Sequence, residues 1–270
     1  MFGVVVLTLA AAPRARAEPA SFEATVLPQL DPTDSSRVLT STQPRGINER
    51  QDVIGWLGFG QGFVWSPQDG DIAFDALFAN TRSQGEAINN AGAFVGHSCA
   101  QESLCLPFVY EPDEGLTMLS TGDASLAGAA ADLNEAGMVV GSLGDGFNSG
   151  SVAAAWVDGE LIEINDPAWM WSTSTSVNNY GVATVNAIFT DVQGVRAYRW
   201  TLAEGLEELP SISAMHATRA LDSNDEGVVV GVSFEDVVTP HPVYWDPNGT
   251  LHVLEGLLPP VSYTHLTLPT

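Results

Sequence analysis

Three short stretches of this chain contain residue types that could do chemistry. In the first, GHSCA, Ser98 has the spacing of a nucleophile elbow, which requires a strand, a sharp turn and then a helix. Here Gly96 belongs to a repeated phrase described below, and a short loop bounded by cysteines follows instead of a helix. We therefore do not expect Ser98 to act as a nucleophile.

The same stretch contains both cysteines of the chain, Cys99 and Cys105. An even number of closely spaced cysteines in an exported protein indicates a disulfide, here one that staples a hairpin loop. A metal site with His97 is the alternative, but it leaves a zinc ion one ligand short of four. We expect the disulfide.

The second stretch, DSNDEG, begins like a calcium loop, with oxygen ligands from Asp222 and Asn224 at alternate positions. The twelfth position is Ser233, where such a loop needs a bidentate Glu. Calcium is thus a weak candidate at Asp222 and Asn224, and we expect no other cofactor.

The third stretch, NDPAWMWSTST, contains Trp169 and Trp171 outside any recurring position. An exposed pair of Trp rings could stack on a sugar, whereas packing between structural units is the alternative. The pair is a hypothetical ligand-binding site.

Composition excludes several classes of partner. The chain has 270 residues, 45% of them hydrophobic, and a formal net charge of −24, and all its basic residues are Arg. Anionic membrane surfaces and nucleic acids would be repelled, so neither is expected as a partner. An unknown protein or a glycan is the expected ligand.

The N-terminus indicates export. Residues 1–17 have the pattern of a cleaved signal peptide, with an apolar run from Phe2 to Ala12 followed by Ala15-Arg16-Ala17. The run is too short to span a membrane. We expect a secreted protein, extracellular or periplasmic, with an N-terminal strand or linker at 18–36. Residues 262–270 match no other part of the chain and are expected to be a non-native tail.

Between these ends one phrase recurs, as in LNEAGMVVG. Its Asn positions lie 41, 45, 44 and 46 residues apart, and a Gly follows seven residues later in every copy but the fourth, which has Val185. The five Asn are Asn48, Asn89, Asn134, Asn178 and Asn224, and the four Gly are Gly55, Gly96, Gly141 and Gly231.

Each phrase predicts a turn followed by a strand. Asn bonds the backbone at the first turn position, and a Gly three residues later supplies a permissive conformation, except that copy one has Gln51. A Gly within the following strand allows another backbone to come close, so we place this strand towards a central axis. An aromatic residue recurs in a later strand, where we expect it to pack between units: Trp65, Tyr110, Trp156, Trp200 and Trp245.

Units of about 44 residues with three clear strands and a fourth candidate strand predict an all-β fold. We expect a β-propeller over residues 37–261 with five recognisable antiparallel units, in a ring that is complete or short of blades. Residues 22–30 resemble the outer strand of a unit and could close the ring by pairing with the last one.

The units, of the form AxxINxxGxVVG … AFxW … GLxxL, resemble the extracellular repeats of the HAF family. The resemblance covers residues 37–258 and implies a secreted bacterial repeat protein, without implying any catalytic residue.

The predicted function is a non-enzymatic binding or scaffolding module. The alternative is a propeller hydrolase acting on an extracellular polysaccharide, which would gather carboxylates with His or Arg at one end of the axis. A third alternative is one module of a larger surface protein.

Overall fold

The computed structural model describes residues 5–7, 24–26, 42–57, 60–68, 70–73, 82–101, 104–123, 126–144, 150–189, 194–213 and 217–254. All regular structure in these ranges is β-strand, which confirms the predicted all-β class. The non-native tail predicted at 262–270 lies outside the described residues, as does most of the predicted signal peptide and linker.

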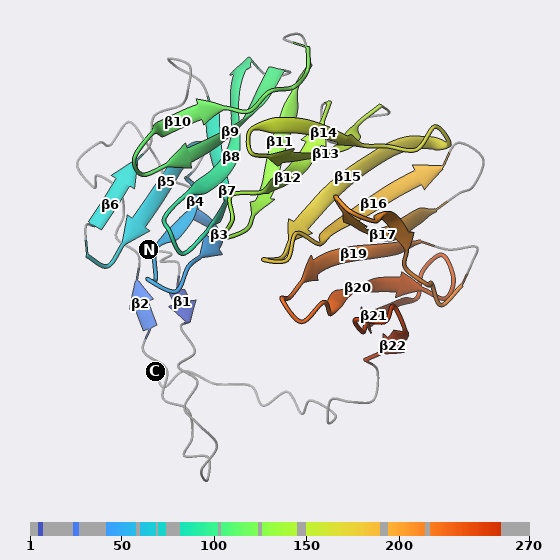
Figure 1. Ribbon diagram of the computed structural model, residues 1–270. Helices are drawn as coiled ribbons and strands as arrows, with labels where there is room; N and C mark the ends of the chain where they lie inside the picture. Colours follow the sequence, from blue (N-terminus) through green and yellow to red (C-terminus); the bar gives the residue numbers. More distant parts are fainter. Residues whose placement is uncertain are drawn as a thin grey trace, which may run out of the picture.

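Five four-stranded antiparallel sheets follow one another along an arc (Figure 1). Each sheet is a meander in chain order. The first strands are β3 (Thr42–Ile47), β7 (Arg82–Ile88), β11 (Gly128–Leu133), β15 (Trp169–Val177) and β19 (Thr218–Ser223). The second strands are β4 (Val53–Leu57), β8 (Phe94–Gln101), β12 (Val139–Leu143), β16 (Ala183–Phe189) and β20 (Val229–Phe234). The third strands are β5 (Gln61–Ser66), β9 (Leu104–Glu111), β13 (Val152–Val157), β17 (Val195–Thr201) and β21 (Pro240–Trp245). The fourth strands are β6 (Gly70–Ala73), β10 (Gly115–Met118), β14 (Glu160–Ile164), β18 (Gly205–Glu208) and β22 (Leu251–Val253).

Two short strands at the N-terminus correct one expectation. β2 (Ala24–Val26) pairs with β1 (Val5–Leu7) and not with the fifth sheet. The fifth sheet already has its own fourth strand, β22, so the position expected for residues 22–30 is taken. The ring is not closed, and sheets one and five stand at the two ends of the arc (Figure 1).

The strand nearest the axis also differs from the expectation. The first strands contact one another from sheet to sheet, from β3 to β7, β11, β15 and β19, so they form the inner edge of the arc. The Gly-bearing strand is second in each sheet. The reason lies in the meander: the Gly strand pairs with the first strand on one side and the aromatic strand on the other, so it has no free edge.

Gly141 is needed for a bulge, not for nearness to the axis. The first strand β11 contains a register shift between Ala130 and Asp132, opposite Gly141. This shift pushes a backbone carbonyl across the second strand, so a Cβ on Gly141 would overlap the oxygen of Ala129. Equivalent overlaps occur at the other three glycines of the phrase, Gly55, Gly96 and Gly231.

Hydrophobic cores lie between neighbouring sheets. Val95 of sheet two packs with Val139 and Trp156 of sheet three, and Val140 of sheet three packs with Trp200 of sheet four. Sheets three, four and five therefore turn their recurring aromatic towards the preceding sheet. Trp156 and Trp245 are almost fully buried, and their indole nitrogens donate across the boundary, to Ser120 O at 2.7 Å and Pro210 O at 2.8 Å. Tyr110 stacks on Phe94 with ring centroids 4.5 Å apart, and Trp65 is half-buried.

Candidate functional site

The five Asn turns lie at one end of the sheets, where each first strand joins its second strand. In the third turn, the Asn134 side-chain oxygen accepts hydrogen bonds from the backbone nitrogens of Ala136 and Met138, at 3.1 and 2.9 Å. Gly137 N donates to Asn134 O at 3.2 Å, and Gly137 has φ +83°. In the first turn Gln51 takes the place of Gly and still adopts φ +68°. The turn geometry therefore survives this substitution, with a conformation that is costly for a side chain.

The amide nitrogens of four of the five Asn reach the next sheet. Asn89 Nδ2 donates to Asn134 O at 3.2 Å, Asn134 Nδ2 to Asn178 O at 3.0 Å, and Asn178 Nδ2 to Asn224 O at 2.9 Å. Asn48 makes the same bond to Asn89 O at 3.0 Å. One Asn side chain thus closes its own turn and joins two sheets. Asn48, Asn89, Asn134 and Asn178 are buried, whereas Asn224 in the last sheet is exposed.

A second chain of hydrogen bonds runs beside the first, through the residue after each Asn. Glu49 N donates to Asn90 Oδ1, Asn90 N to the Glu135 carboxylate, Glu135 N to Asn179 Oδ1, and Asn179 N to Asp225 Oδ1, at 2.8 to 3.0 Å. These five side chains are exposed and lie in a row across the arc. We call the row, together with the turn residues beside it, the turn face: residues 48–52, 89–93, 134–138, 178–182 and 224–228.

The turn face combines anionic groups with an exposed aromatic ring. Hydrogen bonds from the backbone and side chain of Asn179 hold the pKa of Asp225 below its usual value, so this carboxylate stays charged. Tyr180, next to Asn179, is 79% exposed. Carboxylate and amide oxygens accept hydrogen bonds from hydroxyl or ammonium groups, and an exposed ring offers a stacking surface.

The inner edge holds a second set of charged groups. The bulge residues of sheets one and two form an ion pair, Arg45 Nε to Glu86 Oε2 at 2.8 Å, and the other Glu86 oxygen lies 4.0 Å from His97 Nδ1. Burial lowers the pKa of His97, Glu86 raises it and Arg45 lowers it, and the net change is downward. The His97 imidazole is therefore neutral near pH 7.

Asp132 of β11 joins the inner edges of sheets three and four. Its carboxylate accepts hydrogen bonds from Val177 N at 2.8 Å and from Leu133 N at 2.9 Å. Burial raises the pKa of Asp132 to about 6, against these two bonds, and the charge of Asp222 raises it further. A carboxyl with such a pKa can exchange a proton near neutral pH.

The raised pKa of Asp132 makes stability depend on pH. The folded state holds this proton up to about pH 6, whereas the unfolded chain loses it near 3.8, the ordinary pKa of an Asp side chain. The stabilising contribution is therefore complete below that value and is lost as pH rises through 6. We compare the free energy of unfolding of Asp132→Asn with that of the wild type. We expect the difference, variant minus wild type, to be about 2 kcal/mol larger near pH 7.5 than near pH 4. Denaturant titrations at both pH values measure it, and a difference independent of pH would contradict the assignment.

The structure places the other candidate residues as follows. Ser98 is fully buried within β8, and its hydroxyl donates to Arg82 O at 3.3 Å. Cys99 and Cys105 form the predicted disulfide, with sulfurs 2.03 Å apart. Trp169 and Trp171 are both half-buried at the start of β15, where Trp169 contacts Tyr198 with ring centroids 5.1 Å apart.

The calcium candidates lie on either side of the end of β19, Asp222 within the strand and Asn224 in the fifth turn. Asp222 Oδ1 accepts from Ser223 N at 2.8 Å, and Asn224 Oδ1 accepts from Val228 N at 2.9 Å. The Asn224 bond is the one that its equivalents make in every other turn. Calcium binding at this place stays a prediction.

Sequence reasoning missed Tyr180 and the exposed row on the turn face. Its members directly follow the recurring Asn: Glu49, Asn90, Glu135, Asn179 and Asp225. Every one of them carries a side-chain oxygen, and this shared property was the signal that could have identified them.

These features define a β-propeller type of fold, built from repeated sheets joined at their turns. The same fold occurs in a TolB protein of Agrobacterium tumefaciens, with 12% identity over 79% of each chain and a TM-score of 0.54. It also occurs in virginiamycin B lyase of Staphylococcus aureus, with 10% identity over 80% of this chain and 71% of the lyase and a TM-score of 0.52.

The structural similarity extends to part of a larger enzyme. A prolyl endopeptidase matches 78% of this chain with 34% of its own length, at 10% identity and a TM-score of 0.58. No protein-family model matches the sequence, and no curated protein does. At these identities the similarity shows the fold alone. In the described part of the chain, no helix has the length and apolar character to cross a membrane.

Proposed function

We propose that this protein is a non-enzymatic binding module of an exported β-propeller, and that the turn face receives its ligand. The observation that carries the proposal is the exposed row of carboxylates and amides beside Tyr180, which is held in place by backbone hydrogen bonds. A preorganised polar surface with an aromatic ring binds at little entropic cost. The resemblance to HAF-family extracellular repeats supports the same class of function.

The chemistry-bearing residues elsewhere support this view. Ser98 is buried against a carbonyl, Cys99 and Cys105 are joined to each other, and the recurring Asn residues close turns. The disulfide and the apolar N-terminal run support an extracellular or periplasmic location. Because the turn face is anionic, we expect a ligand with hydroxyl or cationic groups, either a glycan or a basic protein segment.

The binding prediction can be tested with the purified protein on a glycan array and on a panel of basic and neutral peptides. We expect Tyr180→Ala and Asp225→Asn each to weaken binding about tenfold, because each removes one side-chain contact with the ligand. Both side chains are exposed, so the melting temperature should stay unchanged. Val238→Ala, which alters an 80% exposed side chain at the opposite end of β20, is the matched control. Equal binding by all four proteins would refute the turn face as the binding site.

The same glycan array distinguishes the hypothetical sugar site at Trp169 and Trp171 from the turn face. Trp171→Ala should lower glycan binding only if the ligand stacks at the start of β15, at the opposite end of the sheets from the turn face. Trp169 is the poorer choice for substitution, because its contacts with Tyr198 and Phe189 contribute to packing.

The second candidate function is hydrolysis of an extracellular polysaccharide. Asp132 favours it, because a carboxyl with a pKa of about 6 at the inner edge, near Asp222, has the property of a general acid. Incubation of wild type and Asp132→Asn with polysaccharides decides the matter. Reducing ends released by the wild type and not by the variant would support the hydrolase.

A further inference from the structure

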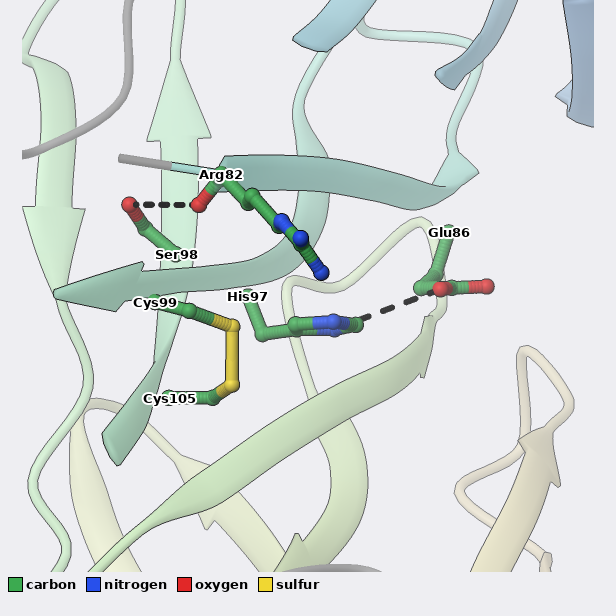
Figure 2. Close-up of a disulfide and its surroundings, with 6 residues drawn as sticks. All are labelled: Arg82, Glu86, His97, Ser98, Cys99 and Cys105. Atoms are coloured by element: carbon green, nitrogen blue, oxygen red, sulfur yellow. Dashed lines mark hydrogen bonds and ion pairs between the residues drawn. A yellow bond between two sulfur atoms is a disulfide. The ribbon is translucent and has the colours of Figure 1, made fainter. Parts of the chain in front are cut away.

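The second sheet gathers a set of metal-ligating side chains at the disulfide. One ligand atom each from His97, Cys99 and Cys105 lies within 4.8 Å of the others. His97 and Cys99 are two residues apart on β8, so their side chains share one face of the sheet. Cys105 on β9 is the direct register partner of Cys99. Figure 2 shows the imidazole between the disulfide and Glu86.

We propose that reduction of the Cys99–Cys105 disulfide converts this cluster into a zinc site, with two thiolates and an imidazole nitrogen of His97 as ligands and water in the fourth position. The two sulfur atoms then either bond to each other or bind zinc. The site is distinct from the turn face and goes beyond the proposed binding function.

The distances suit a tetrahedral ion. Zinc–sulfur bonds of about 2.3 Å and zinc–nitrogen bonds of about 2.0 Å place ligand atoms roughly 3.5 to 4 Å apart. Once the bond between the sulfurs is broken, rotations of the two Cys side chains can open this spacing while β8 and β9 keep their register. Both cysteines and His97 are half-buried, so reductant and metal can reach them.

The surroundings of His97 suit a metal ligand. Its Nδ1 atom is buried and has no hydrogen-bond partner among the described residues, an arrangement that is costly for an imidazole in a merely structural role. Glu86 Oε1 lies 4.0 Å from this atom, while Arg45 holds the other carboxylate oxygen at 2.8 Å. A slightly shorter distance lets Glu86 accept a hydrogen bond from His97 Nδ1. A carboxylate in this position orients the histidines that bind metal ions.

The charges and electrons balance. A dithiol reductant supplies two electrons and two protons, is itself oxidised to a disulfide, and leaves two thiols at Cys99 and Cys105. Zinc binding then releases both thiol protons. Two thiolates neutralise the ion, and the Glu86–Arg45 pair adds no net charge.

The test uses the full-length protein in oxidised and reduced forms. Protein reduced with a dithiol, desalted without oxygen and titrated with zinc against a chromophoric chelator should bind one zinc per chain. The oxidised protein should bind at least a hundredfold more weakly, because its sulfurs are not thiolates. Cobalt in place of zinc should give the sulfur-to-metal absorption of thiolate ligation.

Variants identify the ligands. His97→Ala should weaken zinc binding by the reduced protein about a hundredfold, and Glu86→Gln about tenfold. Glu114→Gln, in an exposed turn of the same sheet, should leave it unchanged. Cys99→Ser with Cys105→Ser should abolish binding; if that variant does not fold, His97→Ala decides the outcome. The proposal is overturned if reduced and oxidised wild type bind zinc equally, or if His97→Ala binds as tightly as the wild type.

Discussion

Replacement of Gly141 with alanine is expected to lower the free energy of unfolding by about 3 kcal/mol or more. A Cβ at this position would overlap the carbonyl oxygen of Ala129 and lie 2.9 Å from Ala130 Cα. Both atoms belong to the backbone of β11, so no side-chain rotation relieves the overlap. The bulge in β11 must shift, and its hydrogen bonds to β12 must weaken. Urea denaturation of wild type and variant measures the loss.

Gly137→Ala is the matched control for Gly141→Ala. Gly137 has φ +83°, and nothing lies within 4 Å of the position its Cβ would take. The alanine there meets only the conformational cost of the left-handed region, about 1 kcal/mol. A loss at Gly141 no larger than that at Gly137 would contradict the bulge explanation.

The fourth sheet shows how the bulge can be held without the Gly. Val185 takes the position there, opposite a register shift between Ser174 and Ser176 of β15. Thr184 Oγ1 accepts from Ser176 N at 3.1 Å, and Ser174 Oγ donates to Thr184 O at 2.8 Å. Buried hydroxyl groups thus support this bulge, whereas Val140, the equivalent of Thr184 in sheet three, offers none. Gly141→Val should therefore be at least as destabilising as Gly141→Ala.

Replacement of Asn134 with alanine is expected to cost about 3 kcal/mol. The variant loses the acceptor for Ala136 N and Met138 N and the donor to Asn178 O, and the bonds with Met138 and Asn178 are buried. Buried backbone groups left without partners cost about 1 to 3 kcal/mol each. Asn134→Asp separates the two roles, because a carboxylate still closes the turn but cannot donate to Asn178 O. We expect Asn134→Asp to lose most of the same stability at neutral pH.

Asn224→Ala provides the comparison from inside the same chain. Asn224 closes an identical turn, but it is exposed, and among the described residues no hydrogen bond joins its amide nitrogen to a following sheet. Water can replace its turn bond, so we expect a loss of about 1 kcal/mol. Val230 shows the same contrast: it is 41% exposed, whereas its equivalents Ile54, Val95 and Val140 are fully buried. Equal losses for Asn134→Ala and Asn224→Ala would show that the inter-sheet bond adds nothing.

Local features of the repeat could be predicted because they depend on neighbouring residues. Asn134 and Gly137 form the expected turn, since an Asn side chain bonds the backbone nearby and a Gly tolerates a positive φ. The same reasoning predicts the strands after the turns and the five repeated units. The predicted propeller fold is confirmed. The Cys99–Cys105 disulfide was also predictable, because two close cysteines flank a short loop.

Other features depend on residues about 44 positions apart and needed the tertiary structure. The sequence shows that Asn134 recurs, but only the stacking of sheets brings its amide to Asn178 O. The sequence pattern of Gly141 predicts a position near the axis, whereas the structure explains this Gly by a carbonyl of the paired strand in its own sheet. The turn face, with Glu135 beside Asn179, exists because successive turns lie side by side.

The sequence by itself therefore determined the repeat, its turns and its strands, because these follow from contacts within a few residues. The tertiary structure decided which strand lines the inner edge, why Gly141 cannot carry a side chain, and why Asp132 holds a proton to about pH 6. Packing between sheets decides the inner edge and buries Asp132, whereas the overlap at Gly141 comes from the bulge in the paired strand of its own sheet.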